Sequence, residues 1–245
     1  PWIAVCDADD TWHPAKLERQ VAFIEGWRQA RPLVAVGTGG YVVDAQDRAV
    51  RPLDFDAEPW DAYLREDTPV GAFVMINSSV VMRADDLREV GGWRGEYTPA
   101  EDTDLWTRLA ERGAVVNLPE RLTNYRLHAS NVSHTGYVEM LLCTHHLLAN
   151  ARRRRRGEPE WTREEFDRHL RADPERHDAL VRALTNLAAY TRSKNAWTSG
   201  RPLAAIGYLV RAALRDPVPT LRLLRRSEAV RRLVGRRLSP GGHIQ

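Results

Sequence analysis

The sequence has only two cysteines, Cys6 and Cys143, and it lacks a long uncharged apolar run. Two cysteines form neither a disulfide framework nor a zinc site on their own, so we expect a reducing, cytoplasmic setting. Cys6 lies in an apolar run and is expected to be buried. The longest uncharged stretch near the middle, 68–82, is too short and too polar to cross a bilayer, which argues against a transmembrane helix.

Lysine is also scarce, since only Lys16 and Lys194 occur among 36 basic residues. The formal net charge of +3 hides an uneven distribution of charge along the chain. Residues 1–140 hold 14 Lys and Arg against 23 Asp and Glu, whereas residues 141–245 hold 22 against 10. We therefore expect the two parts to do different jobs. A run of five arginines, 152–156, is expected to be exposed.

The first part of the chain alternates strand and helix patterns, which is typical of an α/β layer fold. Apolar, β-branched runs predict strands at 2–6, 33–37, 41–44, 49–50, 72–76, 80–83, 114–118 and 122–127. Helical spacing and stop signals predict helices at 14–30, 58–65 and 101–112, and a short helical turn from Asp85. From Val138 onward the strand patterns end, and helices alternate with Gly and Pro breakers. We predict two domains, 1–137 and a basic helical region, 138–245.

An acidic cluster, Asp7-Ala8-Asp9-Asp10, follows the first predicted strand. Three carboxylates at the end of a strand repel one another unless a cation lies between them, and Mg²⁺ or Mn²⁺ prefers oxygen ligands. Ligands of open α/β sheets also bind at the carboxyl ends of strands. The alternative is a simple turn in which Asp10 caps the helix that begins near Pro14.

Two later segments also carry side chains that could take part in catalysis or bind a metal. Glu101-Asp102 stands at the start of a predicted helix, where one carboxylate can act as a general base. The alternative is helix capping, with Asp104 and Arg108 paired across one turn. The segment 125–128 ends in His128, which either completes a metal site as a neutral imidazole or is structural.

Four segments in order resemble the family 2 glycosyltransferases of the GT-A fold: 7–17, 79–93, 101–109 and 119–133. Each segment is weak alone, but their order is fairly specific, and the resemblance covers about residues 1–133. It implies an α/β fold with a GT-A type, Rossmann-like mixed sheet that lacks its first strands, followed by an all-helical C-terminal region. The family begins with strands and a helix that hold the nucleotide base, and none of these precede Pro1. We therefore expect an N-terminally truncated family member.

The resemblance implies an inverting transferase that moves a sugar from a nucleotide-sugar donor to an acceptor hydroxyl by single displacement, assisted by Mg²⁺ or Mn²⁺. Implied acceptors are polysaccharide, lipid-linked or small molecules, as in cell-envelope polysaccharide synthesis. The Gln-x-x-Arg-Trp segment of processive synthases is absent after Asp102, which favours transfer of one sugar at a time.

The resemblance also assigns roles to single residues. Asp102 would be the catalytic base, supported by Glu101. Asp9 would bind the metal that bridges the diphosphate, and His128 would join the metal or the diphosphate. The remaining implied contacts with the nucleotide and metal involve Asp7 near the ribose, Asp10 as an alternative metal ligand, and Arg126.

Two other functions stay open at this point. A metal-dependent phosphohydrolase also uses aspartates at a strand end. An inactive fragment or a basic binding module would need no catalytic residues. The arginine-rich, amphipathic segment 221–238 would suit an anionic membrane, which would place the protein at the inner face of the plasma membrane. Its alternative is a solvated arginine face packed on the acidic half. No nucleic-acid partner is expected, because no recognised module accompanies the charge.

Overall fold

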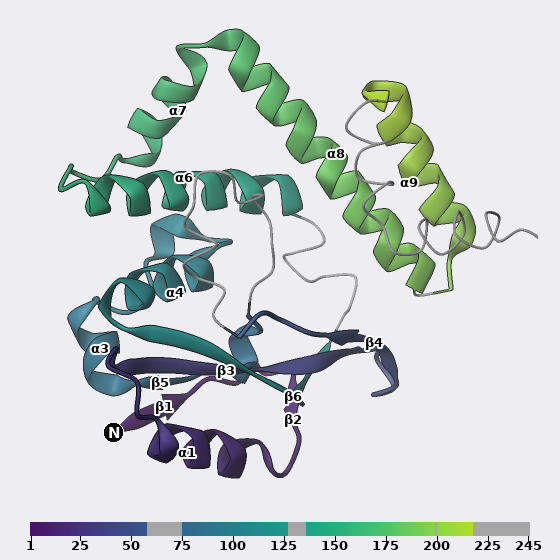
Figure 1. Cartoon of the computed structure of the whole chain (residues 1–245). Coiled ribbons are helices and arrows are strands. Elements are labelled where there is room, and N and C mark those ends of the chain that lie inside the picture. The colour runs from purple at the N-terminus through teal and green to yellow at the C-terminus, as the bar shows by residue number, and fades with distance from the viewer. Residues whose placement is uncertain (58–74, 127–135, 199, 218–245) are drawn as a thin grey trace, which may run out of the picture. The chain divides into compact units, whose positions relative to one another are not determined.

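The computed structural model describes residues 1–57, 75–126, 136–198 and 200–217 (Figure 1). Contacts divide the chain into two compact units, Pro1–Asp167 and Arg168–Gln245. This division lies further along the chain than the boundary predicted from composition at 137/138. The helix that follows the sheet, Tyr137–Arg155, therefore belongs to the sheet-bearing unit.

The first unit is built on a six-stranded mixed sheet in the order β1-β5-β3-β6-β2, with β4 also paired to β3. Among the described strands, only the β3–β6 pair is parallel, and the other pairs are antiparallel. The strands are β1 (Trp2–Ala4), β2 (Thr11–Trp12), β3 (Leu33–Val43), β4 (Ala49–Leu53), β5 (Val81–Arg83) and β6 (Ala114–Arg126). The predicted mixed α/β class is therefore confirmed.

Both central strands are longer than the sequence indicated, because each was predicted as two separate strands. Proline is tolerated in a strand at a bulge, and the pairing of β3 with β6 skips Pro119 and Glu120. Gly40 permits close approach of the two strands, since a Cβ there would lie 2.2 Å from the Thr123 carbonyl oxygen. The prediction of separate strands was wrong because Gly40 and Pro119, which usually interrupt strands, accommodate irregular pairing here.

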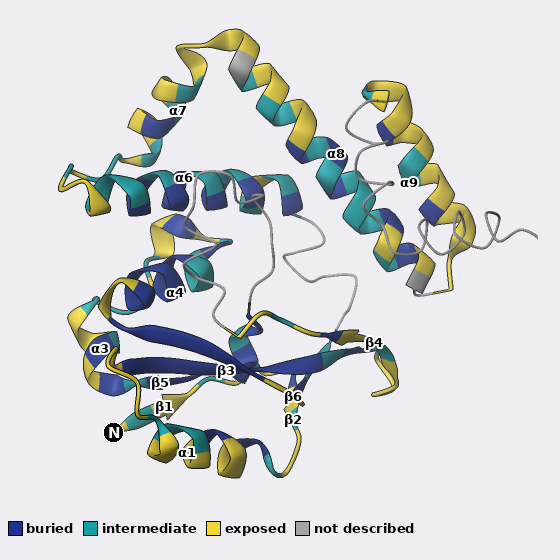
Figure 2. Cartoon of the chain, viewed as in Figure 1, coloured by how far each residue is buried: buried dark blue, intermediate teal, exposed yellow. Residues whose placement is uncertain are grey.

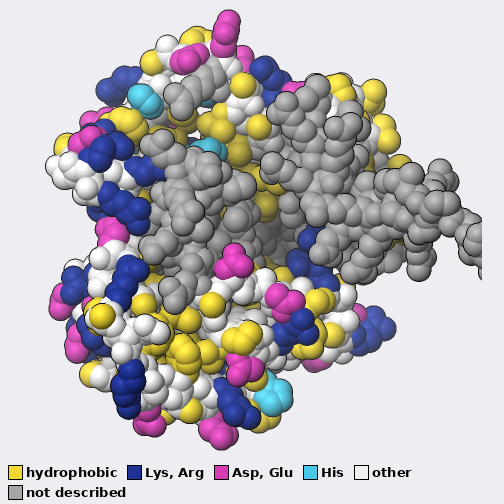
Figure 3. Space-filling view, in the orientation of Figure 1, with side chains coloured by type: hydrophobic (Ala, Val, Ile, Leu, Met, Phe, Trp, Pro, Cys, Tyr) yellow, Lys and Arg dark blue, Asp and Glu magenta, His cyan; other side chains and the backbone are white. Residues whose placement is uncertain are grey.

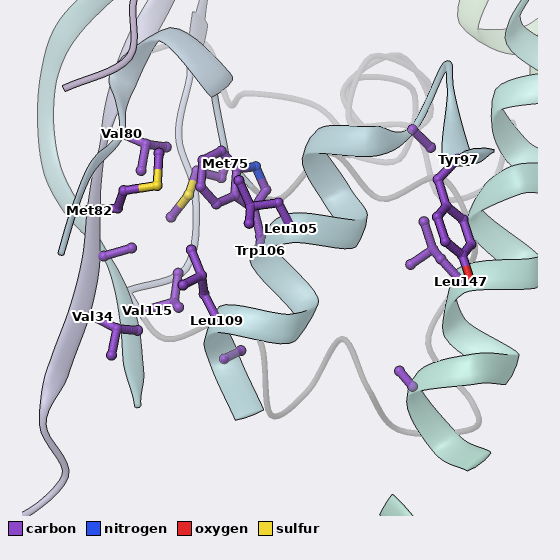
Figure 4. Packing of buried hydrophobic residues seen from close by; sticks show 14 of the residues in the cluster. Val34, Met75, Val80, Met82, Tyr97, Leu105, Trp106, Leu109, Val115 and Leu147 are labelled. Atoms are coloured by element: carbon purple, nitrogen blue, oxygen red, sulfur yellow. The ribbon is translucent and has the colours of Figure 1, made fainter. Parts of the chain in front are cut away.

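Alternate residues of the central strands face two different helix layers. On one face, α1 (Lys16–Gly26) packs through Phe23 and Ile24 against Leu33 and Val116. On the other, α4 (Glu101–Arg112) packs its Leu105, Trp106 and Leu109 against a cluster that includes Val34, Val80, Met82 and Val115 (Figure 4). The sheet is thus covered on both sides, which keeps its register fixed.

The helix α4 has the bounds that the sequence predicted, and Gly113 follows its last residue. A Cβ at Gly113 would lie 2.3 Å from the carbonyl oxygen of Pro32, so only glycine fits there without a shift. The next helix, α6 (Tyr137–Arg155), buries Leu147 and Leu148 in the same core as α4. Composition had grouped α6 with the helical region, whereas its apolar face belongs to the core of the first unit.

The remaining helices are short around the sheet and longer near the C-terminus. Near the sheet lie η1 (Asn77–Ser79), α3 (Ala84–Glu89) and η2 (Gly95–Tyr97), and α3 is followed by Gly91 and Gly92 in the left-handed region, with φ of 78° and 69°. Then come α7 (Arg163–Arg171), α8 (Pro174–Thr198) and α9 (Pro202–Arg215). The predicted helical C-terminal region is confirmed over its described residues, none of whose helices is long and apolar enough to cross a membrane.

Several smaller predictions were wrong. The first strand was predicted at 2–6, but β1 ends at Ala4, and at the edge of the described sheet it leaves Ile3 39% exposed. Cys6 is exposed as well, and α1 ends at Gly26, short of the predicted residue 30. Met75 and Ile76 are not in a strand. The predicted helices 58–65 and 221–238, and residues 72–74 of a predicted strand, lie outside the described residues.

The arginine run 152–156 is only partly exposed, because Arg154 is held between two carboxylates. Its guanidinium lies 2.7 Å from Glu111 and 2.8 Å from Glu160. Acidic and basic side chains are interspersed over the face of the first unit seen in Figure 3. Ion pairing of this kind explains how arginines can lie close to an acidic sheet-bearing unit.

Candidate functional site

The acidic cluster occupies the loop between β1 and β2, and contacts from η1 hold it in place. The backbone N–H of Val5 donates to the Val80 carbonyl at 2.9 Å. The backbone N–H of Asp7 donates to the Ser78 hydroxyl at 3.0 Å, and the Asn77 amide donates to the Asp7 carboxylate at 3.0 Å. The carboxylate of Asp7 is therefore oriented by neighbouring polar groups from a segment about seventy residues away.

Asp10 is the most buried member of the cluster, at 8% exposed. Its Oδ1 accepts a hydrogen bond of 2.8 Å from the Arg126 backbone N–H, while its buried Oδ2 has no hydrogen-bond partner among the described residues. Burial raises the pKa of Asp10, and the nearby charges of Asp9 and Asp7 add to the effect. The capping alternative is wrong, because the residue at the N-cap of α1 is Ala15, with no side-chain cap.

The guanidinium of Arg126 ties the acidic loop to the turn between β3 and β4. It donates to the carbonyl oxygens of Asp9 and Asp44, each at 2.8 Å, and to the Asp47 carboxylate at 2.5 Å. Together with the hydrogen bond from its backbone N–H to Asp10, these contacts show that Arg126 holds the acidic loop against this turn. Its predicted contact with the nucleotide stays a prediction.

The second candidate pair, Glu101 and Asp102, forms the first turn of α4. Asp102 Oδ1 accepts hydrogen bonds from the Thr103 backbone N–H at 2.6 Å and from its hydroxyl at 3.2 Å. Burial, with smaller contributions from the charges of Glu101 and Asp7, raises the pKa of Asp102 to about 6. The Asp7 carboxylate is therefore close enough to raise the pKa of Asp102, although 95 residues separate the two in the sequence.

The other member of that pair is also unusual, because the Oε2 atom of Glu101 is buried and without a hydrogen-bond partner among the described residues. The capping alternative for this turn is not supported: the N-cap of α4 is Ala100, with no side-chain cap. The predicted ion pair within the helix is confirmed, since Arg108 lies 2.6 Å from Asp104.

A metal would find only part of its coordination in the described residues. Within 1–57, 75–126, 136–198 and 200–217, no three His, Cys, Asp or Glu side chains are grouped closely enough to hold a metal ion. Of the two predicted ligands, Asp9 lies on the acidic loop, and His128 lies outside the described residues.

Sequence reasoning missed three residues that shape this site: Asn77, Ser78 and Lys16. Lys16 is completely buried, and its ammonium donates to Gln20 Oε1 at 2.8 Å and lies 4.0 Å from the centre of the Trp12 ring. Burial lowers the pKa of Lys16 to about 8. The signals were present, since Asn77 and Ser78 interrupt an apolar stretch and Lys16 is one of two lysines.

Comparison with known proteins finds relatives that bear a glycosyltransferase name. The chain is 36% identical over 129 residues to the putative glycosyltransferase EpsE of Bacillus subtilis, which is 51% of this chain and 43% of EpsE. It is 25% identical over 138 residues to an uncharacterized glycosyltransferase of Haemophilus influenzae, covering 54% of this chain and 42% of that protein. No family model matches the chain.

A third relative, an uncharacterized protein of Mycobacterium bovis, is 27% identical over 140 residues, or 56% of this chain and 38% of that protein. The chain thus spans less than half the length of the curated relatives it matches. The comparisons support a relationship to glycosyltransferases in general, which is the coarser part of what the sequence predicted.

Proposed function

We propose that this chain forms the catalytic part of an inverting glycosyltransferase of family 2, with a GT-A type fold. It would move a sugar from a nucleotide-sugar donor to the hydroxyl of a glycan, a lipid-linked molecule or a small acceptor. The observation that carries the proposal is the proximity of Asp102 to the acidic cluster, expressed in the effect of Asp7 on the Asp102 pKa. A candidate base thus lies within electrostatic range of a candidate donor-binding carboxylate.

The donor would be bound through the acidic loop. Asp9, with His128, would hold Mg²⁺ or Mn²⁺ against the donor diphosphate, and Asp10 is the alternative ligand. The cation would neutralise the negative charge that develops on the departing nucleoside diphosphate. Asp7, oriented by Asn77, would contact the ribose.

Proton removal from the acceptor is the task proposed for Asp102. A group with a pKa of about 6 is mostly ionised at neutral pH and is still basic enough to accept a proton in the transition state. As the hydroxyl attacks the anomeric carbon and the bond to the diphosphate breaks, its proton would pass to the Asp102 carboxylate. A single displacement of this kind inverts the anomeric centre and needs no covalent sugar intermediate.

The relatives named glycosyltransferases support the proposal. This chain matches less than half the length of each of them, so their names describe longer proteins. The experiment therefore uses the full protein that contains this chain. Purified protein is incubated with a panel of UDP-, GDP- and TDP-sugars plus Mn²⁺, and release of the nucleoside diphosphate is measured.

The test compares Asp9→Asn with Asp85→Asn, which removes a carboxylate from an exposed ion pair on α3. We expect Asp9→Asn to abolish turnover of the sugar nucleotide that the wild-type protein uses, and Asp85→Asn to leave it unchanged. Full activity of Asp9→Asn would overturn the metal assignment. Release of phosphate from simple phosphomonoesters, without sugar-nucleotide turnover, would establish the phosphohydrolase instead.

A further inference from the structure

The helix α9 presents its large apolar residues outward and its small ones inward. Its buried positions against α8 are Ala205 and Ala212. Its most exposed apolar side chains are Leu203, Ile206, Val210 and Leu214, at 85%, 51%, 49% and 82%. Figure 2 shows most of α9 as exposed. Helices of water-soluble proteins ordinarily place their large apolar residues toward the core.

The four exposed side chains form one continuous stripe. With 3.6 residues per turn, they fall within an arc of about 80°, on the side opposite Ala205 and Ala212. Isolated apolar residues on a surface are ordinary, but a contiguous apolar stripe marks an interaction site. The stripe is the only large apolar surface that α9 offers, because its inward face is made of alanine, with Tyr208 and Leu209 half-buried beside it.

The charged side chains within α9 have one sign, and Asp216 follows its last residue. The sequence of α9 contains no acidic residue. Arg211 lies beside one edge of the stripe, and Arg215 lies about 40° further round the helix, toward its buried side. Arg201 precedes the helix, and its backbone N–H donates to the Ala196 carbonyl at 2.8 Å. Next to that turn, Trp197 is 64% exposed. Arginine beside an apolar stripe, with tryptophan at its end, is typical of helices that lie in the headgroup region of a bilayer.

We propose that the outward stripe of α9, Leu203-Ile206-Val210-Leu214, binds the surface of an anionic lipid bilayer, with the helix axis parallel to the membrane. Arg211, beside the stripe, would then lie at the level of the lipid phosphates. A second copy of the chain suits the stripe less well, since stable protein interfaces use about 20–30 residues on each side. The membrane contact predicted from sequence concerned a different segment, 221–238.

The test is binding of the full protein to vesicles, measured by co-sedimentation without any sugar nucleotide. We expect binding to vesicles that contain phosphatidylglycerol. The variant Ile206→Ser/Val210→Ser should bind at least about tenfold more weakly, because it removes apolar groups that enter the bilayer. The matched control is Leu17→Ser/Val21→Ser on α1, whose side chains are similarly exposed, at 45% and 48%. It should bind like the wild type.

Two further variants make the result specific. Leu203→Ser/Leu214→Ser should weaken binding as Ile206→Ser/Val210→Ser does, which guards against a folding defect in one variant. Arg211→Gln/Arg215→Gln should weaken binding to anionic vesicles and reduce its salt dependence, with little effect on vesicles of phosphatidylcholine alone.

Three outcomes would overturn the proposal. The wild-type protein fails to bind anionic vesicles, or the control pair on α1 weakens binding as much as the pair on α9. In the third, the protein dimerises without vesicles and Ile206→Ser/Val210→Ser abolishes the dimer, which would assign the stripe to a second copy. None of these measurements depends on sugar transfer, so the proposal stands or falls separately from the proposed function.

Discussion

At the scale of single residues, the ionisation of Asp102 links the stability of the fold to the proposed chemistry. Burial and the charges of Glu101 and Asp7 raise its pKa to about 6, so the folded protein binds a proton at this site more tightly than the unfolded chain does. Below the pKa of Asp102 in the unfolded chain, near 3.8, the carboxyl is protonated in both states and does not lower the free energy of unfolding. As the pH rises from 3.8 to about 6, the free energy of unfolding falls, and above about 6 this loss of stability is complete.

Replacing Asp102 by Asn should therefore stabilise the protein at neutral and higher pH. A shift of about two pKa units corresponds to about 3 kcal/mol, and loss of a charge-assisted hydrogen bond from Thr103 offsets part of it. We expect a gain of about 1–3 kcal/mol near pH 8 that vanishes near pH 4, measured by urea unfolding at both values. A less stable Asp102→Asn protein near pH 8 would show that the carboxylate is well solvated or well paired.

The same pKa predicts how transfer depends on pH. Protonated Asp102 is far too weak a base to accept the acceptor proton, so kcat/KM should fall about tenfold per pH unit below 6 and level off above it. The measurement is the initial rate of transfer between about pH 4.5 and 8, with donor saturation checked at each pH. A profile that is flat through pH 6 would exclude a base with this pKa.

Some site residues were predictable and others were not, for a physical reason. Asp7, Asp9, Asp10, Glu101 and Asp102 form short acidic segments that attract notice in the sequence. Asn77 and Ser78 interrupt an apolar stretch, but their contact with the acidic loop joins segments about seventy residues apart, and no local pattern encodes that contact. The guanidinium of Arg126 was expected to face a ligand, and its local sequence could not reveal that Asp47 and two carbonyl groups surround it.

At the scale of elements, α4 carries both the candidate base and a buried ion-pair network. The Asp104 side chain is 1% exposed and is shared by Arg94 and Arg108. Arg94 also lies 2.9 Å from Glu160, which connects α4 to the segment after α6. This network fixes the start of α4, and with it the position of Asp102 two residues earlier.

Breaking the network should destabilise the protein strongly. Asp104→Asn leaves two largely buried guanidinium groups without their shared charge, and we expect a loss of about 3 kcal/mol. Asp85→Asn is the matched control, because it removes one partner of an exposed pair with Arg88 and should change stability by less than about 0.5 kcal/mol. Urea unfolding at neutral pH measures both. Similar effects of the two substitutions would mean that the network adds nothing beyond surface pairing.

The elements that the sequence predicted well are those with strong local signals. The bounds of α4 follow from its apolar spacing and from Gly113, which sterically must be glycine. The lengths of β3 and β6 were missed, because Gly40 and Pro119 are breakers in isolation. Only the paired strand shows that Gly40 meets the Thr123 carbonyl and that Pro119 lies in a bulge.

At the scale of the whole chain, the two compact units differ in how much apolar surface they bury. The core of the first unit contains Trp106, Tyr97 and many aliphatic side chains. Among the described residues of the second unit, the buried apolar residues are one leucine, Leu184, and four alanines. Composition predicted the change in helical content between the two parts. It could not place α6, because the partner that covers the apolar face of α6 is α4.

This difference predicts unequal local stability. We expect the backbone amides of α8 and α9 to exchange with deuterium at least about tenfold faster than those of β3 and α4, because few buried apolar contacts hold them. Exchange followed by mass spectrometry at the level of peptides measures it. Equal protection of the two units would indicate that they unfold as one cooperative body.

The most direct test of the central claim separates donor binding from transfer in the full protein. Asp102→Asn should bind the donor nucleotide with Mn²⁺ as tightly as the wild type, measured by calorimetry, while sugar transfer falls by about a hundredfold or more. This result would place Asp102 at the acceptor proton. An equal loss of donor binding and transfer, or transfer at the wild-type rate, would contradict the account.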